Sequence, residues 1–326
     1  MNTMKWLVKR EFWEHKGMLL WAPLAIGAVM ILFSVIMMAK GHDVGLHMEG
    51  PDGEFTSTTV TIADAQSRKM VELSAVGFPA IAAPLYISMA FLVFFYSLGA
   101  LYDERKDRSL LFWKSLPVSD ATTVLSKAGM ALIVVPLVVL AAAYVTSLVI
   151  LLAVYATLAF KGANLFGALF ATPQFWLTPI RMLSLLPVYL LWALPTVGWL
   201  LLVSSWARSK VFLWAVGAPL LVLALLAWAE KAFALGVDIK WFVKHVVFRM
   251  LGSTMPGTWF FGSETAREAM QTAGHVAREQ GPLLMFNEFY LQSWQSVLST
   301  DVLVGAAAGA AMIAGAVWLR RWREEG

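Results

Sequence analysis

The stretch AGMALIVVPLVVLAAAYVTSLVILLAVYATL, residues Ala128–Leu158, is long, apolar and free of charged side chains. About 20 mostly apolar residues suffice for a helix to cross a bilayer, so this stretch predicts a spanning helix with length to spare for tilt. Five further stretches have the same character: Met18–Met38, Val76–Leu101, Met182–Trp206, Val211–Ala229 and Val302–Leu319. We therefore predict an all-α polytopic membrane protein with six transmembrane helices.

The composition agrees with a lipid environment and excludes several kinds of chemistry. Hydrophobic residues make up 59% of the chain and charged residues 14%, whereas soluble domains carry about a quarter charged residues. The absence of cysteine excludes disulfides, thiolate metal sites and cysteine nucleophiles. There is no Gly-Lys dipeptide, hence no Walker A loop, and no H-E-x-x-H or G-x-S-x-G motif. We predict no enzyme activity, no metal site and no cofactor bound by this chain.

The distribution of positive charge predicts the orientation. With the N-terminus in the cytoplasm, the inner segments are 1–17, 102–127, 207–210 and 320–326. They hold 14 of the 25 Lys and Arg residues on less than half as much chain as the outer segments. The positive-inside rule then places both termini in the cytoplasm, as an even number of spans requires. A bacterial inner membrane is the expected location. The first apolar stretch is longer than a signal-peptide core, so we expect it to be retained.

Two regions outside the spans are amphipathic. Residues 1–17 mix aromatic and charged side chains, which predicts a cytoplasmic helix lying in the membrane interface ahead of the transmembrane domain, 18–326. The outer segment 230–301 holds two short apolar-aromatic stretches, Lys240–Leu251 and Leu283–Trp294. We predict that they form helices that lie on or dip into the outer leaflet. The interfacial residues of the first helix are Lys5, Trp6, Lys9, Arg10, Phe12 and Trp13.

The inner connection 102–127 is the most informative segment for function. It opens on a mixed-charge run and continues into an apolar patch that ends at a Leu-Pro break. Ser119 or Asp120 is placed to cap the third span. The segment also fits a solvated loop that anchors its flanking helices. However, exposed apolar residues among charges usually mark a protein partner or the membrane interface.

This connection resembles the coupling loop of ABC-2 type transporter permeases. Glu104-Arg105 and Asp107 match the acidic opening of the family's pattern, Ser109-Leu110 its [ST]-L pair, and Ser115–Ser119 its S-L-P-V-S core, with Lys127 at the trailing basic position. The sequence departs from the pattern at Arg108, Trp113-Lys114 and Asp120. The resemblance implies that these positions affect which ATPase is accepted. It assigns to ATPase coupling Asp103, Glu104, Arg105, Lys106, Asp107, Arg108, Ser109, Leu110, Phe112, Trp113, Lys114, Leu116, Pro117, Ser119 and Asp120.

The resemblance also implies partners and a mechanism. A separate ABC ATPase chain would bind ATP and Mg and dock on the 102–127 loop, and a second permease subunit, identical or related, would complete a dimer. Movement of the loop would tilt spans two and three against spans five and six. The apolar outer segment suggests export of a hydrophobic or amphipathic substrate. Membrane lipid is the other expected partner, and nucleic acid is not expected.

Two other readings stay open. A membrane scaffold or regulatory subunit would bind a cytoplasmic partner at the same loop without conducting anything. An intramembrane enzyme would use His42, Asp43 and His47, the only local cluster suited to a metal. The span interiors carry almost no ionisable residues, which argues against an ion-coupled secondary transporter.

Overall fold

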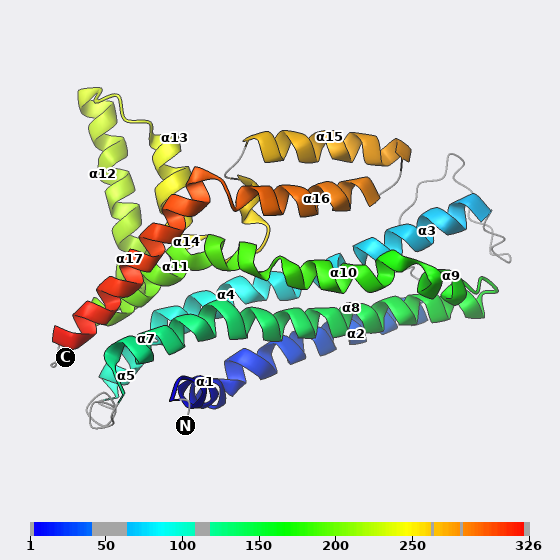
Figure 1. The fold of residues 1–326 in the computed structure, drawn as a ribbon, viewed down its shortest axis with the longest axis horizontal. Helices are drawn as coiled ribbons and strands as arrows, with labels where there is room; N and C mark the ends of the chain where they lie inside the picture. The colour runs from blue at the N-terminus through cyan, green and yellow to red at the C-terminus, as the bar shows by residue number, and fades with distance from the viewer. Residues whose placement is uncertain (1–2, 41–63, 108–117, 262–263, 281–282, 323–326) are drawn as a thin grey trace.

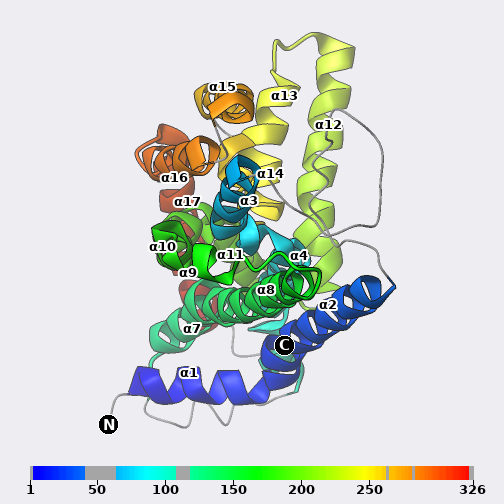
Figure 2. The ribbon, with the colours of Figure 1, turned by 90° about the vertical axis from the view of Figure 1, so that its right-hand side faces the viewer.

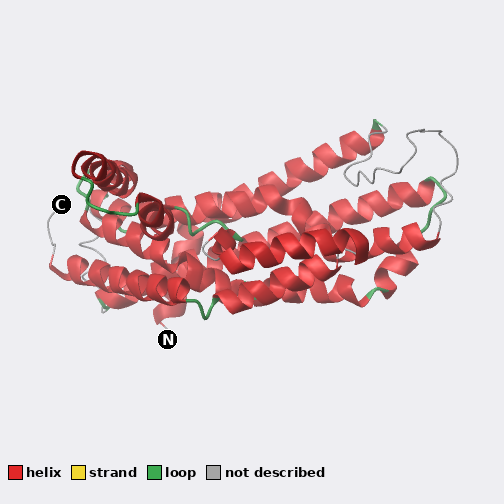
Figure 3. Cartoon of the chain, turned by 90° about the horizontal axis from the view of Figure 1, so that it is seen from above, coloured by secondary structure: helices red, strands yellow, loops and turns green. Residues whose placement is uncertain are grey.

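The computed structural model describes residues 3–40, 64–107, 118–261, 264–280 and 283–322. Within these ranges every regular element is a helix and none is a strand (Figure 3). Among the described residues, six helical runs are long and apolar enough to cross a membrane, which agrees with the predicted number. They are Gly17–Ala39, Ser67–Lys106, Asp120–Phe160, Pro173–Trp206, Leu213–Phe233 and Thr300–Trp322.

Three of these runs contain a π-helical turn that is followed by an α-helix with a proline at its second position. The pairs are η1 (Gly17–Trp21) with α2 (Ala22–Ala39), η3 (Met130–Val134) with α8 (Val135–Phe160), and η4 (Leu213–Gly217) with α12 (Ala218–Phe233). The second residue of each α-helix is a proline: Pro23, Pro136 and Pro219. A proline ring clashes with the carbonyl four residues earlier and lacks an N–H. The wider π-turn relieves that conflict, so the helices continue through these prolines.

The first helix, α1 (Thr3–Glu14), turns away from α2, as Figure 2 shows. It is the helix predicted for the N-terminal segment; its place in the membrane interface stays a prediction. Leu7 and Glu11 are buried, while Trp6 and Trp13 are exposed. One face of α1 therefore packs on the protein and the other is free to contact lipid headgroups.

The second spanning run begins earlier than the apolar stretch from which it was predicted. It comprises α3 (Asp64–Gly77), η2 (Phe78–Ala82), α4 (Ala83–Gly99) and α5 (Tyr102–Lys106). The α3 helix lies almost entirely before the predicted apolar stretch Val76–Leu101. It is held there because Val71 and Ala75 pack on Tyr155, Leu169 and Phe175.

The fourth run forms the centre of the fold. It follows α9 (Phe166–Ala171) and comprises α10 (Pro173–Ser184) and α11 (Leu186–Trp206). The α11 helix packs most extensively on α17 (Thr300–Trp322), and it also contacts α4. Trp192, Val197 and Leu201 on α11 are almost fully buried in the main core. The third run, α7 (Asp120–Gly129) with η3 and α8, lies alongside (Figure 1).

The described residues between α12 and α17 are mostly helical. Its elements are α13 (Ile239–Phe242), η5 (Val243–Val247), α14 (Phe248–Leu251), η6 (Thr258–Phe261), α15 (Glu264–Gln280) and α16 (Leu283–Ser296). The two short helices predicted here are therefore present; their contact with the membrane stays a prediction. The α12 helix stands apart from the bundle (Figures 1 and 2). Only 11% of the apolar stretch within the run Leu213–Phe233 is buried inside the chain.

Two glycines allow α11 and α17 to cross in backbone contact. A Cβ at Gly309 would lie 2.6 Å from the carbonyl carbon of Leu194, and a Cβ at Gly198 would strike the backbone of Gly309. Small residues at such crossings let helix backbones approach closely within a membrane. Backbone atoms cannot rotate aside, so even a methyl group here has to separate the helices.

We expect Gly309→Ala to lower the midpoint of thermal unfolding of the purified protein, because overpacking of this kind costs about 1–3 kcal/mol. The matched control is Gly129→Ala on α7, where a Cβ meets nothing within 4 Å. Tryptophan fluorescence during heating in detergent measures both. Equal midpoints for the two variants would contradict the close crossing.

Candidate functional site

The described part of the predicted coupling loop comprises its two ends. Asp103, Glu104, Arg105, Lys106 and Asp107 lie on or next to α5, and Ser119 and Asp120 begin α7. The residues between them lie outside the described residues: Arg108, Ser109, Leu110, Phe112, Trp113, Lys114, Leu116 and Pro117. Ser119 caps α7, since its hydroxyl accepts a hydrogen bond from the Thr122 N–H at 3.1 Å. This confirms one of the two predicted capping residues.

A buried ionic cluster joins these two ends to distant helices. Lys127 Nζ on α7 lies 2.9 Å from Glu11 Oε1 on α1 and 3.0 Å from Glu104 Oε1 on α5. Arg320 Nη1 on α17 lies 2.8 Å from Glu104 Oε2. The four side chains are between 1% and 9% exposed. We call Glu11, Glu104, Lys127 and Arg320 the ionic cluster.

Two further side chains, Arg10 and Asp120, complete its charge balance. Arg10 Nη2 lies 2.7 Å from Glu11 and 3.5 Å from Glu104. Arg320 Nε donates to Asp120 Oδ1 at 3.1 Å. With Arg10 and Asp120 included, three bases face three acids. Buried charges require this kind of pairing, because an unpaired ion in the interior costs several kcal/mol.

The carboxylate of Glu11 is held in its ionised form. Burial alone would raise its pKa, but Lys127 and Arg10 together lower the pKa below its ordinary value of 4.5. The other carboxylate oxygen, Oε2, accepts a hydrogen bond from the Tyr96 hydroxyl at 3.1 Å. Glu11 thus connects α1 to both α4 and α7.

Arg105 attaches α5 to the end of α11. Its Nη2 donates to the backbone oxygens of Ser204 and Ala207, the latter at 2.8 Å. In return the Ser204 hydroxyl accepts from the backbone N–H groups of Leu101 and Tyr102 at 3.0 and 2.9 Å. The ends of the loop are therefore bound to α1, α11 and α17. These contacts connect α5 and α7 directly to the three helices.

The remaining predicted residues are distributed between surface and interior. Asp103, Lys106 and Asp107 are exposed beside the buried Glu104. On α1, Lys5, Trp6, Lys9 and Trp13 are exposed and Phe12 packs against the core. Arg10, predicted to face the interface, instead contacts the ionic cluster.

Sequence reasoning missed Glu11, Tyr96 and Arg320. Glu11 follows Leu7 by four residues, so the two share a helix face. A carboxylate on the buried face of an amphipathic helix was the available signal. In the sequence analysis Arg320 contributed only to the number of positive charges in the predicted inner segment 320–326.

Comparison of the chain with protein-family models, with curated proteins and with solved structures finds no match. Among the described residues no group of His, Cys, Asp and Glu is arranged to hold a metal ion. The predicted alternative cluster of His42, Asp43 and His47 lies outside them.

We expect Lys127→Met to destabilise the protein by about 3–5 kcal/mol, because it removes the shared cation from two buried carboxylates. The exposed Lys5→Met is the matched control. The double variant Glu11→Gln/Lys127→Met should recover part of the loss, since it also removes one of the stranded charges. Thermal unfolding in detergent reports all three. A Lys127→Met midpoint equal to that of Lys5→Met would contradict the cluster.

The lowered pKa of Glu11 predicts a pH dependence of stability. Above 4.5 the carboxylate is ionised in the folded and unfolded chain, and its ion pairs contribute fully. As the pH falls through the lower pKa of the folded state, that contribution is lost. The stability difference between wild type and Glu11→Gln should therefore shrink from neutral pH to below 4.5. A difference that stays constant over this range would refute this role.

Proposed function

We propose that this chain is the transmembrane permease subunit of an ATP-driven ABC transporter of the ABC-2 type. ATP binding and hydrolysis belong to a separate ATPase chain that docks on the 102–127 loop. The chain itself performs no chemistry and works as a dimer with an identical or related subunit. Export of a hydrophobic or amphipathic substrate across a bacterial inner membrane, with both termini cytoplasmic, is the activity proposed.

The observation that carries this proposal is the ionic cluster at the ends of the loop. A loop that only joins two spans needs no buried ion pairs to a helix at each end of the chain. Here Glu104 and Lys127 flank the motif that resembles the family's coupling loop, and they are bound to α1 and α17. Exposed Lys106 and Asp107 stand beside them and are available to a partner.

The proposed mechanism follows the contacts. Closure of the paired ATPases moves the loop, and the rigid ends of the loop pass this movement on. Arg105 carries it to α11, and Glu104 carries it through Arg320 to α17. Because α11 and α17 cross in backbone contact, they move together. The α12 helix, whose surface is mostly uncovered within the chain, is free to face lipid or the second subunit.

We expect an ATPase to co-purify with the chain from its native membrane in mild detergent, and to be lost when Lys106→Glu, Asp107→Arg and Trp113→Ala are combined. These changes spare the buried cluster, so the variant should retain its unfolding midpoint. The measurement is the nucleotide-binding protein and ATP hydrolysis recovered with each preparation.

The control variant Lys240→Glu/Glu268→Arg reverses two exposed charges far from the loop and should keep the ATPase. Recovery of no ATPase with wild type would overturn the proposal. ATPase binding without ATP-dependent substrate movement in proteoliposomes would instead identify a non-conducting scaffold or regulatory subunit.

A further inference from the structure

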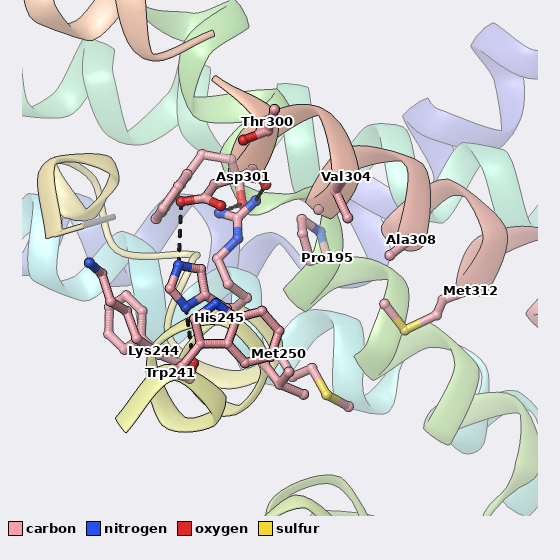
Figure 4. Close-up of a pocket in the computed structure, with 15 residues that line it drawn as sticks. Pro195, Trp241, Lys244, His245, Met250, Thr300, Asp301, Val304, Ala308 and Met312 are labelled. Atoms are coloured by element: carbon pink, nitrogen blue, oxygen red, sulfur yellow. Dashed lines mark hydrogen bonds and ion pairs between the residues drawn. The ribbon is translucent and has the colours of Figure 1, made fainter. Parts of the chain in front are cut away.

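A cavity of about 480 Å³ lies between α11, the α13–α14 region and the first half of α17 (Figure 4). It is at the opposite end of α17 from the ionic cluster. Its lining combines charged and apolar side chains. The ionisable residues are Lys244, His245, Arg249 and Asp301.

Arg249 is a buried cation without a buried counterion. It is 6% exposed, and its guanidinium carbon lies 3.6 Å from the centroid of the Trp192 ring. Nη1 donates to the backbone oxygen of Trp192 at 3.1 Å and to the Ser253 hydroxyl at 3.3 Å. Nη2 has only a long contact, 3.5 Å, to the backbone oxygen of Asp301. Its Nε–H has no hydrogen-bond partner among the described residues.

The carboxylate nearest to Arg249 is directed to another residue. Asp301 Oδ2 lies 3.5 Å from His245 Nε2 (Figure 4). His245 Nδ1 donates to the Trp241 backbone oxygen at 3.0 Å, and its ring stacks on the Trp241 indole. Lys244 forms no ion pair with a described residue. Two cations and one carboxylate, with a histidine between them, leave this wall of the cavity with excess positive charge.

The rest of the cavity is apolar and opens toward the exterior of α17. Val304, Ala308 and Met312 recur every four residues along one face of this helix, opposite Pro195 of α11 (Figure 4). Val304 is 68% exposed, so this wall continues onto the outer surface of the spanning helix. Gly305 provides the space for the guanidinium, because a Cβ there would strike Arg249 Nη2.

We infer that this cavity binds an amphiphile with an anionic headgroup, the headgroup at Arg249 and Lys244 and the acyl chain along Val304, Ala308 and Met312. Charge complementarity identifies the headgroup, because charge-assisted hydrogen bonds to an oxyanion satisfy the donors that Arg249 leaves open. The apolar wall indicates an acyl chain in the ligand, because a small soluble anion would make no favourable contact with a hydrophobic surface. Exposed Trp241 at the rim suits a membrane interface.

The binding is a property of this chain alone and is tested without an ATPase. That such an amphiphile is also the transported cargo rests on the proposed function. Recovery of no ATPase with the wild-type chain would therefore overturn the transporter and leave this site intact, whereas failure of lipid binding would leave the ATPase result intact.

The experiment uses the full chain in a neutral detergent, titrated with dioleoyl phosphatidylglycerol, dioleoyl phosphatidylcholine or glycerol 3-phosphate. Native mass spectrometry counts bound lipid and thermal unfolding measures stabilisation. We expect phosphatidylglycerol to bind at least about 10-fold more tightly than phosphatidylcholine, as a charge-assisted contact of about 1.5 kcal/mol or more implies. Glycerol 3-phosphate alone should give no stabilisation.

Variants separate the two halves of the cavity. Arg249→Met and Lys244→Gln should each reduce the preference for phosphatidylglycerol, and Ala308→Phe should weaken both lipids by filling the apolar wall. Lys240→Gln, an exposed residue outside the lining, should bind as wild type does.

Equal binding of the two lipids by wild type would overturn the proposal. So would unchanged binding in Lys244→Gln and Ala308→Phe, which test it even if Arg249→Met does not fold. Stabilisation by glycerol 3-phosphate that matches phosphatidylglycerol would identify a soluble-anion site and overturn the amphiphile.

Discussion

The end of the fold that carries the 102–127 loop depends on one ammonium group shared by two carboxylates. Lys127 Nζ lies about equally close to Glu11 and Glu104, and all three side chains are excluded from solvent. Desolvating three charges is costly, so the arrangement persists only while the geometry is complete. This requirement positions α1 and α5 relative to α7. Arg320 extends the constraint to α17, although it lies 216 residues after its partner Glu104 in the sequence.

The glycine crossing of α11 and α17 complements this constraint along the length of the bundle. The ionic cluster holds one end of α17, the Gly198–Gly309 contact holds its middle, and the backbone of Asp301 contacts Arg249 near the other end. The α5 helix is also bound to α11 through Arg105, so direct contacts join α5, α11 and α17. The α12 helix has no comparable set of contacts, as its low burial shows. The set of helices joined by these contacts therefore does not include α12.

Sequence reasoning could predict the spans because each is a local property of about 20 consecutive residues. The helices in the 230–301 segment were predicted on the same basis. The ionic cluster was not, because its members look ordinary in their own neighbourhoods: Glu11 sits among exposed charges, and Arg320 resembles any basic residue at the end of a span. Their pairing appears only when four distant helices are brought together. The coupling role of Phe112 and Trp113 stays a prediction, since they lie outside the described residues.

The two buried arginines in contact with α17 show how structural and binding roles can be separated. Arg320 and Arg249 are 7% and 6% exposed, so both have lost nearly all their water. Arg320 recovers that cost from the carboxylates of Glu104 and Asp120. Arg249 has only carbonyl and hydroxyl oxygens and an indole ring, and it faces a cavity. Carboxylates of the chain itself therefore compensate the charge of the first arginine. Arg249 retains an uncompensated charge beside the apolar wall of the cavity. The headgroup of an anionic amphiphile would pair with that charge, and its acyl chain would cover the apolar wall.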